Sequence, residues 1–248
     1  MKMKHILNFS FSLCFLLMFT LAQAQEKPTV KSDSLQVADS IPVKKDRYGL
    51  RVGVDLFKLT RGLYDKNYKG IELTGDFRWN KKYYLAAELG NENKTTEDDR
   101  LTSNSKGSYL KAGFDYNMYE NWLDMENIIS IGLRYGFSTF SQELYSYKIY
   151  NPNPYWGELP PIPATQQYNG LSASWIEVVT GMKAKMFNNV CVGFSVQLKT
   201  LVTNKKPEGF DNLYIPGFNR TYNGSFGIGF NYSVTYFVPL YKKKVVVK

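Results

Sequence analysis

Apolar residues recur at every second position in eight segments between residues 48 and 236. In the first segment, Leu50, Val52 and Val54 alternate with Arg51, Gly53 and Asp55. A two-residue period is that of a β-strand with two unlike faces. The same rhythm runs through segments 71–79, 83–90, 110–116, 129–137, 176–185, 190–199 and 226–236. The sequence therefore predicts an all-β fold with eight strands.

The connections between these segments alternate in length. Short links are expected at 80–82, 119–125 and 187–189, and longer ones at 60–67, 91–107, 139–171 and 203–222. An antiparallel barrel in a membrane has an even number of strands, tight turns on its periplasmic side and long loops outside. We therefore expect residues 47–240 to form an eight-stranded antiparallel transmembrane β-barrel with short periplasmic turns and long extracellular loops.

The two ends of the chain differ from the barrel region. Residues 1–24 have a basic start, an apolar stretch and the small-residue ending Ala22-Gln23-Ala24, which is typical of a cleavable secretory signal peptide. Residues 25–46 are polar with two prolines and predict a flexible periplasmic linker. Residues 241–248 form a basic C-terminal tail. The expected location is the outer membrane, after cleavage of the signal peptide.

Charged side chains in the predicted strands all fall on the face opposite the apolar row. A Lys or Arg that faces the middle of a bilayer costs roughly 2 to 4 kcal/mol, so these charges are expected to line the lumen. The inverted arrangement is a soluble lipocalin-like cup with the apolar rows inside. It is excluded by volume, because the interior of an eight-stranded barrel is too narrow for the many large apolar side chains of these rows. The thirteen residues are Arg51, Asp55, Glu72, Asp76, Arg78, Glu88, Lys111, Asp115, Arg134, Glu177, Lys183, Lys185 and Lys199.

These lumen charges comprise seven cations and six anions. Near balance favours internal ion pairs, and long paired side chains fill a barrel this narrow, so we expect a plugged barrel that conducts little. The alternative is a small porin-like channel with a charge-lined lumen.

The residue inventory argues against an enzyme. The only histidine, His5, lies in the expected signal peptide, which leaves no histidine for general-base catalysis, a Ser-His-Asp triad or a metal site. The acidic cluster at 97–99 lacks the spacing of a calcium loop and is expected to be a solvated loop. We expect no catalytic residue, no cofactor and no metal.

The link 139–171 is rich in aromatic residues and prolines. Exposed Tyr and Trp are typical contact anchors, so this link is a candidate partner-contact loop; alternatively its rings pack over the barrel mouth as a lid. The link 203–222 has the same character, and the two together are expected to form one cap. The candidate contact residues are Tyr145, Tyr147, Tyr150, Tyr155, Trp156 and Tyr168.

The leader ending AQAQ, the polar stretch after it and the strands RYGLRVGVDL and SFGIGFNYSVTYF resemble small outer-membrane β-barrel proteins of Bacteroidota. The resemblance implies an accessory subunit of a larger outer-membrane machine, such as the barrel assembly machinery. The expected partners are outer-membrane lipid and other outer-membrane or periplasmic proteins, and not nucleic acid. The sequence departs from the usual pattern because Phe237 is followed by four further residues and a basic tail instead of ending the last strand.

Overall fold

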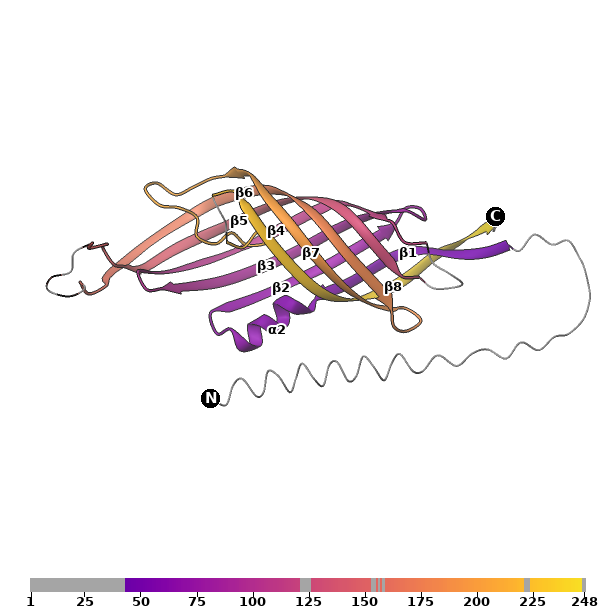
Figure 1. Ribbon diagram of the computed structural model, residues 1–248, viewed down its shortest axis with the longest axis horizontal. Coiled ribbons are helices and arrows are strands. Elements are labelled where there is room, and N and C mark those ends of the chain that lie inside the picture. Colours follow the sequence, from indigo (N-terminus) through magenta and orange to yellow (C-terminus); the bar gives the residue numbers. More distant parts are fainter. Residues whose placement is uncertain are drawn as a thin grey trace, which may run out of the picture. The chain divides into compact units, whose positions relative to one another are not determined.

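The computed structural model describes residues 43–120, 126–152, 155, 157, 159–220 and 224–246. This part of the chain contains eight long strands and one short helix (Figure 1). The elements are β1 (Val43–Asp55), α2 (Leu56–Tyr64), β2 (Tyr68–Arg78), β3 (Tyr83–Asp98), β4 (Leu101–Asn117), β5 (Ile128–Tyr147), β6 (Ile162–Lys185), β7 (Val190–Asn204) and β8 (Phe226–Val246).

The strands form a closed barrel in the order of the sequence, with β8 returning to β1. Every neighbouring pair is antiparallel. The expected eight-stranded antiparallel barrel is therefore confirmed. Among the residues that the structure describes, no helix is long and apolar enough to cross a membrane.

The wall of the barrel is apolar outside and polar inside. Val52, Leu89 and Phe230 are about half exposed, whereas Glu72, Lys111 and Glu177 are almost completely buried. A water-soluble barrel has the opposite arrangement, since burial of unpaired charge is unfavourable and large apolar patches do not normally face water. The barrel is therefore built to cross a membrane, with lipid against its apolar wall.

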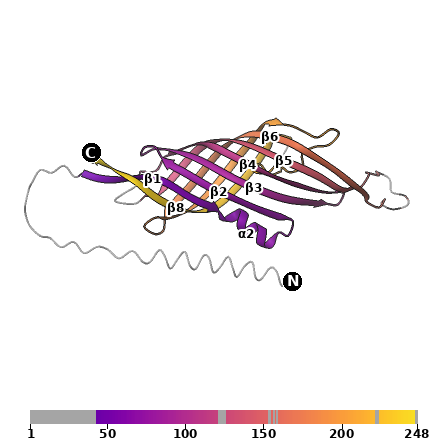
Figure 2. The ribbon, with the colours of Figure 1, turned by 180° about the vertical axis from the view of Figure 1, so that it is seen from behind.

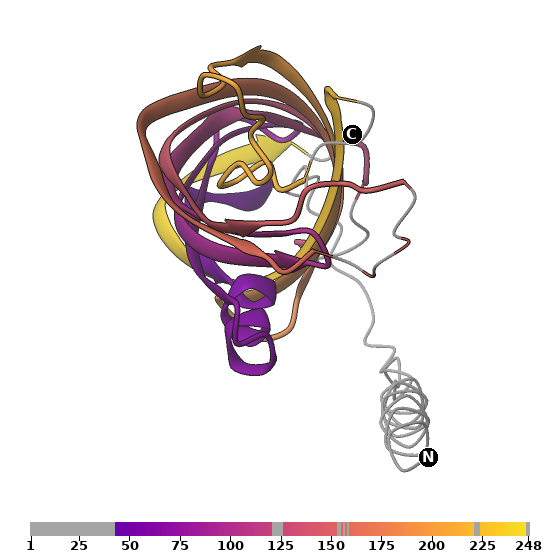
Figure 3. The same cartoon turned by 90° about the vertical axis from the view of Figure 1, so that its left-hand side faces the viewer.

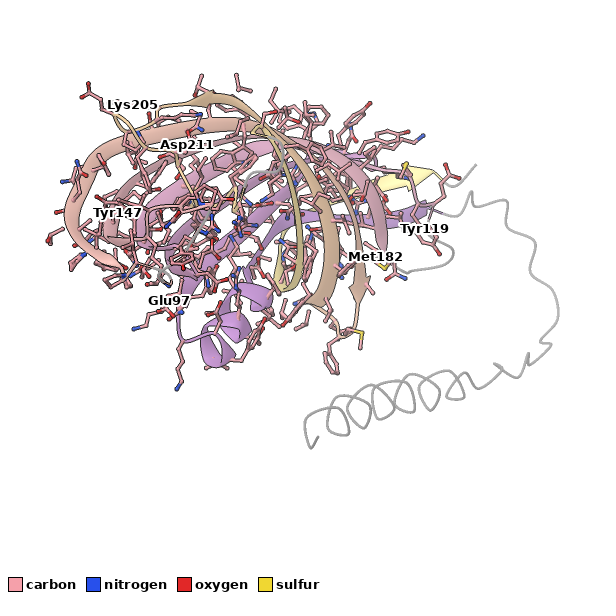
Figure 4. All side chains as sticks on the ribbon, turned by 60° about the vertical axis from the view of Figure 1, so that its left-hand side comes forward. Glu97, Tyr119, Tyr147, Met182, Lys205 and Asp211 are labelled. Atoms are coloured by element: carbon pink, nitrogen blue, oxygen red, sulfur yellow. The ribbon has the colours of Figure 1, made fainter. Side chains whose placement is uncertain are left out.

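The two ends of the barrel differ. At the turn end lie residues 79–82, 118–120, 126–127 and 186–189, together with the start of β1 and the end of β8. At the loop end lie α2, the turn at 99–100 and residues 148–152, 159–161 and 205–220. Figure 4 places Glu97, Tyr147, Lys205 and Asp211 toward the loop end, and Tyr119 and Met182 toward the turn end.

Several strands are longer than the alternation predicts. The expected loop 91–107 is largely a hairpin, because β3 and β4 pair up to Asp98↔Leu101, and much of 139–171 belongs to β5 and β6. Outward side chains become polar beyond the apolar wall, so the hydrophobic rhythm ends while the backbone hydrogen-bond ladder continues. The β5–β6 hairpin projects past the neighbouring strands (Figure 2).

The expected boundaries of the linker and the tail also change. Residues 43–46, expected in the linker, open β1, and residues 241–246 of the expected tail continue β8; the two strands pair as far as Val43↔Val246. This pairing is made by backbone hydrogen bonds, which do not require apolar and polar side chains to alternate. The sequence therefore carries no signal for it. The expected signal peptide and residues 25–42 lie outside the described residues, as do residues 247–248.

Part of the barrel wall is closed by a helix. β1 pairs with β2 at only five positions, from Leu50↔Phe77 to Val54↔Leu73, and with β8 no further than Asp55↔Ser233. Toward the loop end, β2 and β8 continue without β1 between them. α2 lies at this gap, outside the ring of strands, and packs against both (Figure 3).

Local chemistry starts α2 where β1 stops. The Asp55 carboxylate caps the helix and accepts hydrogen bonds from the Phe57 and Lys58 backbone N–H groups at 2.7 and 3.4 Å. The Phe57 ring packs against Phe230 of β8, with ring centroids 4.6 Å apart. The Thr60 hydroxyl hydrogen-bonds the Tyr232 hydroxyl. These contacts hold α2 across the gap.

Candidate functional site

The lumen at the loop end contains an ion-pair network that begins on α2. Lys58 extends from the helix through the gap in the wall, and its ammonium lies 2.8 Å from Glu72 and 2.5 Å from Glu92. It also hydrogen-bonds the Tyr109 hydroxyl, which in turn donates to Glu72. One cation from outside the ring thus neutralises carboxylates on two strands, as buried charges require.

Lys111 continues the network across the lumen. Its ammonium lies 2.8 Å from Glu88 and 3.2 Å from Glu72, and 3.9 Å from Glu177 on the far side. Lys199 lies 3.4 Å from Glu177. Five strands therefore meet through alternating charges in the middle of the barrel.

A second group of ion pairs lies nearer the turn end. Asp76 accepts from Arg51 at 2.6 Å and from Lys183 at 2.6 Å, and the Arg134 guanidinium lies 2.8 Å from Asp115. Paired Arg and carboxylate side chains hold each other through charge-assisted hydrogen bonds, which are stronger than neutral ones. This group fills the lumen between the central network and the rim.

The rim at the turn end has its own pairs. The Arg47 guanidinium hydrogen-bonds Glu126 and the carbonyl oxygen of Asn188. Burial alone would raise the pKa of the Glu126 carboxyl, but the hydrogen bond and charge of Arg47, with Lys185 at 3.3 Å, hold that pKa below its usual range. Arg78 lies 3.7 Å from Asp46. Turns far apart in sequence are joined here.

Residues 205–220, which we call the plug segment, fold back into the mouth of the barrel (Figure 3). Both backbone polar groups of Gly217 are hydrogen-bonded to charged side chains of the lumen. The N–H donates to Glu92 at 3.1 Å, and the carbonyl accepts from Lys199 at 2.7 Å. Tyr214 also donates to Glu92, at 2.6 Å. The plug segment is thus bonded directly to the charge network of the lumen.

Apolar packing surrounds the same contact. Ile215 and Phe218 of the plug segment are completely buried, in a cluster with Tyr109, Phe140 and Trp175. Between α2 and the plug segment a cavity of about 20 Å³ remains, which is room for one water molecule. The mouth of the barrel is therefore filled by the protein's own side chains.

Gln142 of β5 fixes the outer part of the plug segment. Its side-chain amide donates to the Asp211 carbonyl at 3.0 Å and accepts from the Leu213 backbone N–H at 3.2 Å. Gln142 is fully buried although it lies in the region expected as a loop. The backbone groups of the plug segment thus find partners in the wall.

Ten of the thirteen charges expected in the lumen are buried, and Arg78, Lys183 and Lys185 are partly buried. Asp55 serves as the cap of α2, and the other twelve form the ion pairs already described or lie at the turn-end rim. Sequence reasoning missed Lys58 and Glu92, which lie outside the segments with clear alternation. The detectable signal for α2 was Asp55 as a helix cap, followed by Leu56, Leu59 and Leu63 at helical spacing.

The six aromatic residues expected to contact partners are divided by the structure. Tyr145 and Tyr147 lie in β5 with exposed rings, and Tyr150 and Tyr155 are exposed in the link beyond it. Tyr168 in β6 instead stacks on Phe210 of the plug segment at 6.0 Å. Trp156 lies outside the described residues.

The described side chains of the lumen provide charge pairing and close packing. In the described part of the chain, no three His, Cys, Asp or Glu side chains are grouped to hold a metal ion. Cys191 is buried in the wall. The lumen carboxylates other than Asp55 form ion pairs with Lys or Arg side chains, and Asp55 accepts hydrogen bonds from backbone N–H groups of α2.

Comparison with known proteins places the chain in a family. A family described as "Domain of unknown function (DUF6048)" matches residues 6–243. The chain belongs to this family. The DUF6048 match includes all eight strands and α2, with β8 covered as far as Lys243.

No curated protein matches the chain. The structure is similar to the crystal structure of Ail, the attachment invasion locus protein of Yersinia pestis, with 10% sequence identity and a TM-score of 0.41. The similarity covers 77% of this chain and 98% of that chain.

Proposed function

We propose that this protein is a non-enzymatic outer-membrane β-barrel that acts as a structural or interaction subunit of a larger outer-membrane complex. The observation that carries the proposal is the seat of Gly217 between Glu92 and Lys199, because it fills the lumen at the mouth. A barrel filled in this way is a rigid support, and its function lies on its outer surfaces.

The β5–β6 hairpin is the best candidate for the contact surface at the loop end. It projects past the other strands, and its link exposes large apolar side chains, among them Tyr150 at 64% and Tyr155 at 84% (Figure 1). Exposed aromatic side chains on a defined scaffold lose little conformational entropy on binding and are frequent anchors of interfaces. The partner at this surface is another outer-membrane protein, and a subunit of the barrel assembly machinery is one such protein.

Copurification tests this proposal. The tagged protein is extracted from native membranes in mild detergent, and its partners are identified by mass spectrometry. The variant Tyr150→Ala/Tyr155→Ala is expected to lose the stable partner at the loop end, while Tyr64→Ala, on exposed α2, retains it. A wild-type protein that migrates alone would contradict the proposal.

The porin-like channel is the competing hypothesis. It requires water and ions to pass the plug segment and the paired charges, which occupy the same lumen. Planar-bilayer recording separates the two functions: steady single-channel conductance in the wild-type protein would favour the channel, and a silent bilayer favours the interaction subunit.

A further inference from the structure

The outer wall of the barrel carries an open hollow close to the loop end. It has a volume of about 560 Å³ and is lined by residues of β3, β4, β5 and β6, among them the backbone of the buried Phe140 and Leu171. Most of the lining side chains are short amides and hydroxyls. The polar side chains that line the hollow include Asn91, Asn93, Lys106, Ser108, Thr139 and Ser141.

The strand register places the hollow directly above the apolar wall. Cross-strand partners on the outer face form rows that run from strand to strand. One such row is polar, and the next row, two residues along each strand toward the turn end, is apolar. The polar row is Asn91, Ser108, Thr139 and Ser172, and the apolar row is Leu89, Leu110 and Phe137. The two rows are about 7 Å apart along the strands. The hollow therefore lies where a bilayer changes from acyl chains to headgroups.

One lysine, Lys106, lines the hollow, and a second, Lys69, lies beside it on β2. Lys69 on β2 pairs with Asn93, and Asn93 pairs with Lys106 on β4, so the lysines are two strands, or about 10 Å, apart. Both side chains are exposed, and neither forms an ion pair with another described residue. This contrasts with the lumen, where the lysines have carboxylate partners.

We propose that this hollow binds the headgroup of an outer-leaflet lipid that contains both phosphate and sugar. Lys69 and Lys106 pair with phosphate. Asn91 donates to the Ser108 hydroxyl at 2.9 Å and Asn93 accepts from Asn104 at 2.7 Å, and the remaining donors and acceptors of Asn91, Asn93 and Ser108 hydrogen-bond sugar hydroxyls. The acyl chains lie along the apolar row below. The inference rests on the proposed outer-membrane location, and it adds a specific lipid to that location.

The phosphate requirement follows from the unpaired cations, and the sugar requirement follows from the size and lining of the hollow. A single phosphate occupies only a small part of such a volume. Amides and hydroxyls offer both donors and acceptors, as sugar hydroxyls do. The direct continuation into the apolar wall favours a lipid over a free sugar phosphate.

Native mass spectrometry of the detergent-purified protein tests the proposal. The probes are diphosphorylated lipid A, the same lipid without phosphates, phosphatidylglycerol and inorganic phosphate. Diphosphorylated lipid A is expected to bind the wild-type protein. Lys69→Gln/Lys106→Gln is expected to bind it roughly 30-fold more weakly, because each lysine near an anionic surface contributes about fivefold.

Two further variants make the test specific. Lys66→Gln/Lys82→Gln removes the same charge outside the hollow and is expected to bind like the wild type. Ser108→Phe fills the hollow without changing charge and is expected to lose binding. Heat-dependent migration of each variant on gels shows that the barrel has folded.

The outcomes separate the possibilities. Equal lipid A binding by Lys69→Gln/Lys106→Gln and the wild type would overturn the proposal. Equally tight binding of phosphatidylglycerol or of the phosphate-free lipid would remove the sugar or the phosphate requirement and also overturn it. Displacement by inorganic phosphate would assign the site to a free anion. If lipid A does not bind the wild-type protein while partners still copurify with it, the lipid proposal is wrong and the proposed interaction role is retained.

Discussion

The ammonium group of Lys58 lies 2.8 Å from the Glu72 carboxylate, although one residue belongs to a helix outside the barrel wall and the other to a strand that lines the lumen. Their contact runs through the gap where β1 ends and β2 continues. The same ammonium reaches Glu92, which holds the plug segment through Gly217. The helix, the barrel wall and the plug segment are therefore linked through Lys58, Glu92 and Gly217.

Removal of the Lys58 charge is expected to destabilise the barrel. In Lys58→Met, Glu72 and Glu92 lose a cation that they share, and breaking a buried pair costs about 3 to 5 kcal/mol. Reversible urea unfolding in lipid vesicles measures the loss in the free energy of unfolding. Lys66→Met is the matched control on the exposed loop after α2, and equal stability of the two variants would contradict this role.

A methyl group at Gly217 is expected to displace the plug segment. A Cβ there would lie 2.6 Å from the Tyr109 ring, and the backbone φ of +81° already disfavours alanine. Gly209→Ala is a matched control, because Gly209 has φ +72° but no atom within 4 Å of its Cβ position. Limited proteolysis of the folded protein should cut the plug segment of Gly217→Ala faster than that of Gly209→Ala, and equal cleavage rates would contradict the proposed role of Gly217 in holding the plug segment.

The alternation of apolar and polar residues was sufficient to predict the barrel, because Leu50, Val52 and Val54 face lipid while Arg51 and Asp55 face the lumen. The bilayer requires apolar side chains and the lumen requires polar ones, and successive residues of a strand face one and then the other. The sequence therefore shows a two-residue period.

The same signal disappears where the bilayer ends. Asn91, Asn93 and Lys106 face outward but are polar, so residues 91–107 were expected to be a loop although the β3–β4 ladder continues through them. The seat of the plug segment was equally hidden. It depends on a positive φ at Gly217 and on Glu92 and Lys199, which are far from it in sequence.

The rim at the turn end predicts an acid-sensitive contribution to stability. The folded pKa of Glu126 is lowered, so its contribution is present above the unfolded pKa of about 4.3 and is lost as pH falls through the folded value. Glu126→Gln should lower stability at pH 7 by about 1 kcal/mol and flatten the decline below pH ~5. Glu120→Gln, at an exposed carboxylate of the same link, should keep the wild-type profile in a series of urea titrations.

The Asp65–Lys94 pair predicts a similar effect at the loop end. The backbone N–H of Asp65 caps the end of α2 by donating to the Arg61 carbonyl. The hydrogen bond from Lys94, at 2.8 Å, lowers the pKa of the Asp65 carboxyl. Its stabilisation is therefore present at neutral pH and lost on acidification below about pH 4. Asp65→Asn should increase hydrogen exchange of α2 amides at pH 7 but much less at pH 3. Exchange rates that are unchanged at pH 7 would show that this pair does not secure the helix.

The most direct test of the account is the environment of the outer wall. Nitroxide labels at Val52 and Phe230, measured by electron paramagnetic resonance in vesicles, should be accessible to oxygen dissolved in the bilayer and protected from a water-soluble nickel complex. A label at Lys82, on a turn, should show the reverse. Access of the nickel complex to Val52 and Phe230 in the folded protein would contradict a lipid-facing wall around a charge-paired, plugged lumen.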